Sequence, residues 1–329
     1  MLFADFSKIP SEGIEVVTPF ESRVITHAFH DIDGTHSLIR QWVPVMTLCT
    51  GCISVEGCKD DATVEELVAQ ISAHKPEEYP EAHDFSIESA GLSALTQMEW
   101  AIRNAIVRGK IVLQGTTPEK CVECVRRIWA GQEVFADVDE TADFRARLAA
   151  MSERLFRAYE ILLLKMGRDA NLAAARRNPA PWRVAGSMEF LQYLKDCGVK
   201  NYFVTGAVVE YDEDGNAHGT MAEEVIALGY EIGAGKLIEK LEGSTWQEKL
   251  PKNEIMFNLC KKDGIDPSHV IITGDGRSEI DAGVQMGALC ISRLPLDAKR
   301  QRQIHRNLKT NIIIEKYELP VLSSFLIRK

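Results

Sequence analysis

Apolar runs that end in small or acidic residues recur along this chain, a pattern typical of buried strands that carry functional loops at their ends. The runs and the residues after them are 23–30 before Asp31–Thr35, 200–204 before Thr205–Gly206, and 270–273 before Gly274–Gly276. Helix-period segments that stop at Gly198 and Gly264 precede the second and third runs, and further apolar runs cover 288–292 and 311–314. Apolar strands that alternate with helices predict an α/β fold with a doubly wound, Rossmann-like parallel sheet as its core.

Residues 41–180 follow a different pattern, with helical periods and few strand signals. The signals are a capping box at Thr63–Glu66, a start at Thr117–Pro118 with a stop near Gly131, and helical periods over 86–108 and over 139–166 with a stop at Gly167. We therefore predict a core made of residues 1–40 and 181–329, interrupted by a large inserted α-helical cap domain at 41–180.

The composition argues against several classes of protein. The 329 residues carry 38 Lys+Arg against 48 Asp+Glu, a net charge of -10, which argues against broad nucleic-acid binding. Apolar runs stay far below the roughly 18 residues of a membrane-spanning helix, and the N-terminal segment has no basic leader. We expect a cytoplasmic protein with reduced thiols that acts on a small molecule, with no nucleic-acid or membrane partner, and we leave its oligomeric state open.

Two carboxylates lie at the end of the first run. Asp31 and Asp33 are two residues apart on an extended strand, so both side chains leave the same face. Like charges this close raise a pKa, and a divalent cation relieves the repulsion. A third carboxylate at Asp275 would complete a set of hard oxygen ligands. Few protein oxygens with several waters suit Mg²⁺, which shares its shell with a phosphate.

Groups that suit a phosphate stand at the ends of other elements. Thr205 supplies a hydroxyl, and Gly206 supplies a backbone N–H. Lys252 adds a cation at the start of a helix, where the helix dipole also favours an anion. Taken singly, each has an ordinary reading: a strand-to-loop turn for Thr205–Gly206, and a solvated lysine for Lys252.

Together, these groups resemble the four ordered motifs of the haloacid dehalogenase-like (HAD) superfamily of phosphatases. The motifs are Asp-x-Asp-Gly-Thr at 31–35, Thr205 after an apolar strand, Lys252, and Gly-Asp-Gly-x-x-Glu at 274–279. The pentapeptide at a strand end is a strong signal, and four motifs in order are stronger. The resemblance covers about residues 20–40 and 180–329, and the insert is similar to that superfamily's helical cap placed after the first core strand.

The resemblance implies a mechanism and a metal site. Asp31 would attack phosphorus and form an aspartyl-phosphate, and Asp33 would protonate the leaving alkoxide and then activate water. The implied Mg²⁺ ligands are the Asp31 carboxylate, the Asp33 backbone carbonyl and Asp275. His36 departs from the pattern, because the family commonly has an apolar residue after the threonine.

The resemblance also implies that the phosphate oxygens are held by Thr205, the Gly206 N–H and Lys252. Lys249 is a competing candidate for the phosphate lysine, and the spacing to Asp275 favours Lys252. Glu279 stands where the family more usually has Asp, and the implied role is contact with the metal through water. The simpler alternative for Glu279 is an acid in the first turn of a helix, where the dipole favours it.

These readings predict an Mg²⁺-dependent phosphomonoester hydrolase that acts on a small soluble phosphate ester through an aspartyl-phosphate. The cap is expected to cover the crevice at the strand ends and to select the leaving group. One alternative is a sugar-phosphate mutase of the same fold, in which the phosphoryl group returns to the substrate. The other is a non-catalytic module whose insert binds a partner, although intact motifs argue against it.

The cysteines of the insert leave a second metal question open. Cys49-x-x-Cys52 and Cys121-x-x-Cys124 both lie in the insert, with Cys58 nearby. Two such pairs can form a four-thiolate zinc site. Cys121 and Cys124 also fall on the apolar face of a helical frame, and packing in the core is the more common outcome for such cysteines.

Overall fold

The computed structural model describes residues 1–90, 92–245 and 250–329. They form two compact units, which we describe separately: a core unit of residues 1–40 and 171–329, and a helical unit of residues 41–170. The sequence sets the return to the core at 181, whereas the contacts of the structure set it at Asn171, inside helix α7 (Asp169–Arg177). No helix in the described ranges is both long and apolar enough to cross a membrane.

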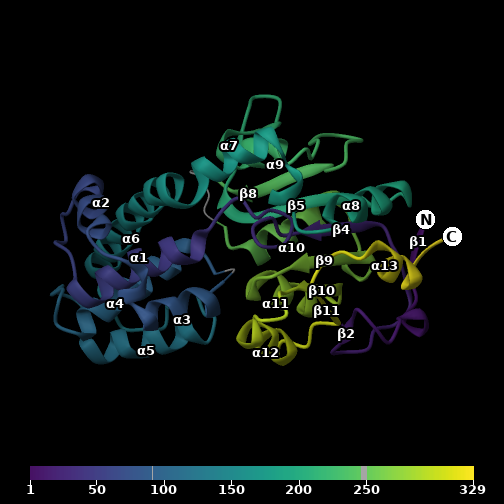
Figure 1. Cartoon of the computed structure of the whole chain (residues 1–329). Coiled ribbons are helices and arrows are strands. Elements are labelled where there is room, and N and C mark those ends of the chain that lie inside the picture. Colours follow the sequence, from purple (N-terminus) through teal and green to yellow (C-terminus); the bar gives the residue numbers. More distant parts are fainter. Residues whose placement is uncertain (91, 246–249) are drawn as a thin grey trace. The chain divides into compact units, whose positions relative to one another are not determined.

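A seven-stranded sheet forms the centre of the core unit (Figure 1). Its strands, in spatial order, are β2 (Glu15–Val16), β11 (Ile312–Ile314), β10 (Leu289–Arg293), β9 (Val270–Gly274), β4 (His27–His30), β5 (Lys200–Val208) and β8 (Lys240–Ser244). All neighbours are parallel except β2, which is antiparallel to β11. The chain runs from β4 outward to β8, then returns to β9 and runs outward the other way. This order confirms the doubly wound α/β core.

Helices cover both faces of this sheet because neighbouring residues of each buried strand point to opposite sides. On one face, Ala28 and Ile271 pack with Phe190 of α8. On the other, Phe29 and Ile272 pack with Met256 of α10. Each fully buried Ile, Phe or Met side chain contributes about 1.5–3 kcal/mol. The helices of the core unit are α8 (Ser187–Asp196), α9 (Gly219–Ala227), α10 (Lys252–Asp263), α11 (Arg277–Met286), α12 (Lys299–Asn307) and α13 (Leu319–Phe325).

Two strand predictions need correction. The run 23–30 is not one strand: β3 (Arg23–Ile25) pairs with β1 (Leu2–Ala4) in an antiparallel sheet with β12 (Leu326–Arg328). The chain changes sheets at Thr26, whose N–H donates to the His269 carbonyl. The second run does not end at 204, because β5 continues to Val208 through an irregularity in its pairing with β8. Apolar character reports burial, and it does not report which partner a strand pairs with.

A short hairpin and several 3-10 turns complete the core unit. The strands β6 (Glu210–Tyr211) and β7 (Ala217–His218) are joined by a turn in which the Asp212 carboxylate accepts the N–H groups of Asp214 and Asn216. The 3-10 turns are η1 (Phe6–Lys8), η4 (Ala180–Trp182) and η5 (Pro267–His269).

The helical unit has its own apolar core, built from helices only loosely marked in the sequence. They are α1 (Trp42–Glu56), α2 (Val64–Ser72), the 3-10 turn η2 (Pro76–Glu78), α3 (Pro80–Glu88), α4 (Ala94–Val107), α5 (Pro118–Trp129), α6 (Ala142–Leu163) and the π-helical turn η3 (Leu164–Arg168), which leads into α7. The capping box of Thr63 with Glu66 and the N-cap at Thr117 are confirmed.

Two helix predictions for this unit are wrong. The expected helix over 86–108 is two helices, α3 and α4. Glu133, distant in sequence, accepts the Ser93 N–H and the Thr96 hydroxyl at the start of α4. The expected stop at Gly167 does not occur, because the chain continues through the π turn into α7. A Cβ on Gly167 would lie 2.8 Å from the Gln41 carbonyl oxygen, so this glycine permits a close approach of two segments instead of ending a helix.

Candidate active site

The register of two adjacent parallel strands brings Asp31 and Asp275 together. In the pairing of β4 with β9, His30 stands opposite Thr273, and the Asp31 N–H donates to the Thr273 carbonyl at 2.9 Å. The Thr35 hydroxyl is a shared donor, 3.2 Å from Asp31 Oδ2 and 3.3 Å from Asp275 Oδ1. The strands β4 and β9 also flank the point where the winding of the sheet reverses, which is where open α/β sheets bind their ligands.

A glycine makes the turn after Asp33 possible. Gly34 has a φ of +78°, a conformation that L side chains rarely adopt, and a Cβ there would run into the Asp275 carboxylate. Arg293 Nη1 donates to the Gly34 carbonyl at 2.8 Å and fixes the turn. The loop therefore lies directly against the carboxylate of the neighbouring strand end.

Lys252 reaches the same cluster from the first position of α10, with Pro251 at the N-cap. Its Nζ lies 2.5 Å from Asp31 Oδ1 and 3.1 Å from Glu279 Oε2, and the side chain is buried. Burial acts to lower the pKa of Lys252, but Asp31 and Glu279 outweigh it and hold that pKa above its ordinary value. Lys249, the competing candidate, lies outside the described residues.

Glu279 performs two tasks at the start of α11. Its Oε1 accepts the Gly276 N–H at 2.6 Å, which caps the helix, and its Oε2 pairs with Lys252. The fully buried carboxylate is thus both the first-turn acid of the simpler reading and a part of the charged cluster. With both oxygens engaged, it orients Lys252.

Asp33 points toward a different partner from Asp31. Its Oδ2 lies 4.0 Å from Arg40 Nε, and Arg40 in turn forms a two-pronged pair with Glu224 at 2.8 and 3.0 Å. Its Oδ1 is buried and has no hydrogen-bond partner among the described residues. Burial raises the pKa of Asp33 to about 7; Arg40 opposes the rise, and Glu224 and Asp31 add to it. Sequence reasoning missed Arg40 and Glu224, because they lie far apart in the chain and belong to no motif.

Thr205 and Gly206 lie beyond the end of β4 on the neighbouring strand. His30 of β4 stands opposite Phe203 of β5, so Thr205 is two residues further along. The Thr205 side chain is buried, and its Oγ1 accepts the Ala207 N–H at 3.1 Å, whereas Gly206 is exposed. These two residues share the sheet edge with Asp31, and no described contact joins them to the carboxylate cluster.

His36, the departure from the motif, is fully buried behind the loop. Its ring stacks on Tyr317 at a centroid distance of 4.9 Å, and its Nδ1 lies 2.6 Å from the Ser187 hydroxyl. Burial holds the pKa of His36 well below its ordinary value, so the ring is neutral. The neutral ring is therefore packed in the interior of the core unit, with polar neighbours at its nitrogens.

The donor set fits a hard divalent cation. Carboxylate oxygens of Asp31, Asp275 and Glu279 lie within 4.8 Å of one another. Burial raises the pKa of Asp31 and of Asp275, and neighbouring carboxylates add to both shifts. Lys252 supplies one positive charge to these three acids, so the cluster carries excess negative charge in a buried place. Oxygen ligands of this kind suit Mg²⁺.

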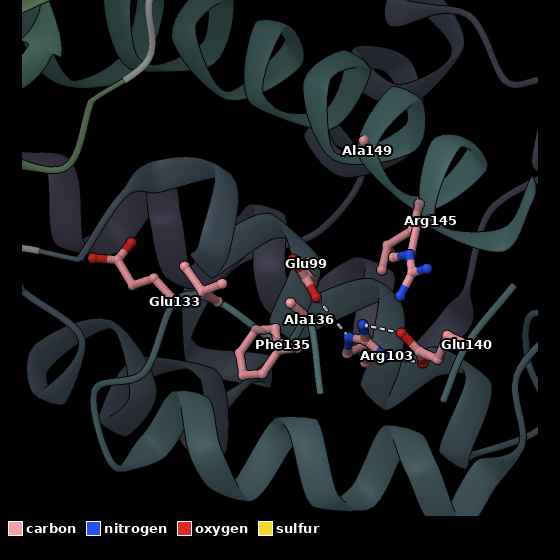
Figure 2. Close-up of a pocket in the computed structure, with 10 residues that line it drawn as sticks. Glu99, Arg103, Glu133, Phe135, Ala136, Glu140, Arg145 and Ala149 are labelled. Atoms are coloured by element: carbon pink, nitrogen blue, oxygen red, sulfur yellow. Dashed lines mark hydrogen bonds and ion pairs between the residues drawn. The ribbon is translucent and has the colours of Figure 1, made fainter. Parts of the chain in front are cut away.

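A cavity in the helical unit is built differently (Figure 2). Figure 2 shows Arg103 between two carboxylates: its Nε donates to Glu99 at 2.7 Å, and Nη1 and Nη2 donate to Glu140 at 2.7 and 2.9 Å. The guanidinium also lies 5.7 Å from the centroid of the Phe135 ring. With its donors engaged by protein groups, Arg103 fixes α4 to the segment before α6.

The two cysteine pairs of the helical unit do not form a shared zinc site. Within the described ranges, Cys49, Cys52, Cys121 and Cys124 are free and buried, and they are not brought within ligand distance as a group. Cys121 and Cys124 belong to the apolar core, as the helical frame of α5 indicates.

Comparisons with known proteins add the following. No protein-family profile matches the sequence, and no curated protein sequence matches it either. Similar solved structures include a predicted phosphatase from Clostridium acetobutylicum, with a TM-score of 0.48 and 12% identity over 92% of this chain and 98% of that chain. Another is a phosphonoacetaldehyde hydrolase-like protein from Oleispira antarctica, with a TM-score of 0.47 and 13% identity over 93% of this chain and 94% of that chain. A third is a beta-phosphoglucomutase from Clostridium difficile, with a TM-score of 0.41 and 10% identity over 92% of this chain and 97% of that chain.

The names of these three structures are those of a phosphatase, a hydrolase-like protein and a mutase. The identities are low and the TM-scores are below 0.5. These likenesses therefore carry no function over to this chain.

Proposed function

We propose that this protein is an Mg²⁺-dependent phosphomonoester hydrolase that acts on a small soluble phosphate ester through an aspartyl-phosphate on Asp31. The observation that carries the proposal is the setting of Asp31. Its carboxylate lies at the reversal point of the sheet, 2.5 Å from Lys252 Nζ, with the Thr35 hydroxyl shared between it and Asp275.

The chemistry follows from this arrangement. An Asp31 oxygen attacks phosphorus, and the bond from phosphorus to the ester oxygen breaks. Asp33 gives its proton to the leaving alkoxide. A water molecule then attacks the phosphorus of the aspartyl-phosphate, passes a proton back to Asp33, and releases Asp31 and inorganic phosphate. A carboxyl group whose pKa is about 7 suits both proton transfers.

The remaining residues hold charge. Lys252, the Thr205 hydroxyl and the Gly206 N–H bind the phosphoryl oxygens, so most of the rate gain comes from positioning and from charge stabilisation. The Asp31 carboxylate, the Asp33 backbone carbonyl and Asp275 would hold the Mg²⁺. When bound, the ion would neutralise charge on the phosphoryl group and on the clustered acids.

A panel of phosphate esters tests the proposal by release of inorganic phosphate with and without Mg²⁺. We expect Mg²⁺-dependent turnover, and a loss of at least about 10⁴-fold in Asp31→Asn because the nucleophile is removed. Asp196→Asn changes an exposed carboxylate on α8 and serves as the matched control with wild-type turnover.

The covalent step has its own readout. Rapid acid quenching with a labelled ester should trap label on Asp31, and Asp33→Asn should accumulate this species because water is no longer activated. Wild-type turnover in Asp31→Asn would exclude the nucleophile. A phosphorylated product in place of free phosphate would favour the mutase over the hydrolase.

A further inference from the structure

A second cluster of possible metal ligands lies in the helical unit, away from the motifs. Cys52 and Glu56 are four residues apart on α1, so they share one face of the helix. His74 comes from the segment after α2. The Cys52 Sγ, a Glu56 carboxylate oxygen and a His74 ring nitrogen all lie within 4.8 Å of one another, and His74 Nε2 is 3.2 Å from Glu56 Oε1.

The other nitrogen of the His74 ring also has a carboxylate partner. His74 Nδ1 lies 3.2 Å from Glu78 Oε2, in η2. Metal-binding histidines almost always donate their second N–H to a carboxylate or a carbonyl, which fixes the tautomer and turns the free nitrogen toward the metal. The two carboxylates therefore contact different nitrogens of the ring. Glu78 lies at Nδ1 and orients the ring, and Glu56 lies at Nε2, in the group that includes the thiol.

The local fold places polar groups around a buried sulfur. Gln70 Nε2 donates to the Gly57 carbonyl at 2.8 Å and lies 3.8 Å from Cys52 Sγ. Tyr79 is only 6% exposed, and its buried hydroxyl has no hydrogen-bond partner among the described residues.

A glycine on α1 makes room for that tyrosine. A Cβ on Gly51 would overlap the Tyr79 ring, so the ring packs against α1 at this point only because residue 51 has no side chain. The Tyr79 ring also lies 5.9 Å from that of His74. A buried thiol, a histidine oriented by a glutamate and the ring of Tyr79 thus lie near the end of α1.

We propose that Cys52, Glu56 and His74 bind a Zn²⁺ ion, with the fourth position open to water. Tetrahedral zinc with bonds of about 2.0–2.3 Å places its ligand atoms about 3.3–3.7 Å apart, which small side-chain movements within this cluster achieve. A thiolate, an imidazole and a carboxylate favour zinc over Mg²⁺ or Ca²⁺. The Cys52 thiol releases its proton on binding, and the thiolate and the Glu56 carboxylate balance the two positive charges.

The bound ion would join the end of α1 to the segment between α2 and α3. This role is independent of the proposed phosphatase activity, because it uses none of the residues around Asp31. It also replaces the four-thiolate arrangement considered from the sequence with a mixed set that keeps Cys52 alone of the four.

Titration of the chelator-treated full-length chain with Co²⁺, in excess Mg²⁺, tests the site. We expect one equivalent of Co²⁺ with a near-ultraviolet thiolate-to-cobalt absorption band, displaced by one equivalent of Zn²⁺. His74→Gln and Glu56→Gln change side chains that are 22% and 40% exposed, so both variants should fold. Each should weaken binding at least about 100-fold, and Glu78→Gln about 10–100-fold.

Matched controls separate this site from others. His83→Gln changes an exposed histidine on α3 of the same unit and should bind like the wild type, and so should Asp31→Asn, which alters the candidate active site. Cys52→Ala should lose the thiolate band, whereas Cys49→Ala, one turn away on α1, should keep it. An absence of the band in the wild type, or His74→Gln affinity equal to the wild type, would overturn the proposal.

Discussion

Each unit of this protein buries a basic side chain between two carboxylates, but the two arrangements differ in how the charges balance. In the helical unit, Arg103 donates from three nitrogens to Glu99 and Glu140, and the Thr116 hydroxyl also donates to Glu140. In the core unit, Lys252 pairs with Asp31 and Glu279, and Asp275 adds a further buried acid.

This difference is the one expected between a structural ion pair and the proposed active site. A planar guanidinium satisfies a carboxylate with two parallel hydrogen bonds, so the cluster around Arg103 is closed by its own partners. The ammonium of Lys252 is a point charge that leaves carboxylate oxygens available to a cation. Burial alone therefore does not distinguish the two. The third acid beside one ammonium, at the carboxyl ends of parallel strands, does distinguish them.

The largest expected effects come from removing the two basic side chains. Lys252→Met leaves Asp31 and Glu279 buried without their counter-charge, and Arg103→Met does the same to Glu99 and Glu140. Each should lower the free energy of unfolding by about 3–5 kcal/mol in a urea titration. Lys252→Met should also reduce phosphate release at least about 10³-fold.

Arg103→Met serves as the matched control for that comparison, and it should retain phosphate release per folded molecule. Loss of turnover in folded Arg103→Met would mean that the cluster of the helical unit takes part in the chemistry. Full turnover in Lys252→Met would exclude a role for Lys252 in binding the phosphoryl group.

A smaller loss of stability is expected when one glycine in each unit is replaced by alanine. Gly34→Ala forces a methyl group onto Asp275 at a φ of +78°, and Gly115→Ala forces one onto the side chain of Thr141, the N-cap of α6, at a φ of +93°. Both should cost about 1–2 kcal/mol of stability from the backbone conformation, measured by thermal unfolding. Only Gly34→Ala should slow phosphate release, by about 10²-fold, because it displaces a carboxylate of the site. Equal rates in the two variants would contradict the placement of Asp275.

The sequence predicts the core unit better than the helical unit, and the reason is physical. Asp31, Lys252 and Asp275 follow strands or start a helix, so the topology of a parallel sheet already brings them to one edge. The alternation of strands and helices gives that topology directly. The sequence does not reveal ion pairs between distant segments of the core unit, such as Arg40 with Glu224. A repeating pattern of apolar residues carries no information about which polar side chains will meet.

The helical unit shows the same limit more strongly. Its helix starts at Thr63 and Thr117 are local signals and were predictable, because a cap is formed within a few residues. The start of α4 depends on Glu133, and the continuation past Gly167 depends on a contact with Gln41. Both depend on distant contacts. Predicted roles for Thr205 and Gly206 stay predictions, because no described contact joins them to the carboxylates.

The core unit should lose stability as the pH falls, because it buries the neutral ring of His36. Burial holds the pKa of His36 well below 6.5, so the unfolded chain binds a proton that the folded chain does not. The stability from neutral His36 is complete above pH 6.5 and falls as the pH drops below it, by about 1.4 kcal/mol per pH unit. His36→Asn should flatten the pH dependence of unfolding between about pH 6 and 5 by that slope, measured by urea titration at each pH. An unchanged slope would show that His36 is protonated in the folded state.

The smallest expected effect concerns a cap in the helical unit. The exposed Thr63 accepts the Glu66 N–H at 3.2 Å, and the Glu66 carboxylate accepts the Thr63 N–H at 2.8 Å. Thr63→Ala should lower stability by about 1 kcal/mol in thermal unfolding, and Thr63→Ser should restore it. Glu279 forms the corresponding cap on α11 and also pairs with Lys252, so only the cap on α11 is part of the proposed active site. Phosphate release should stay unchanged in Thr63→Ala, and a slower rate would mean that the start of α2 influences the site.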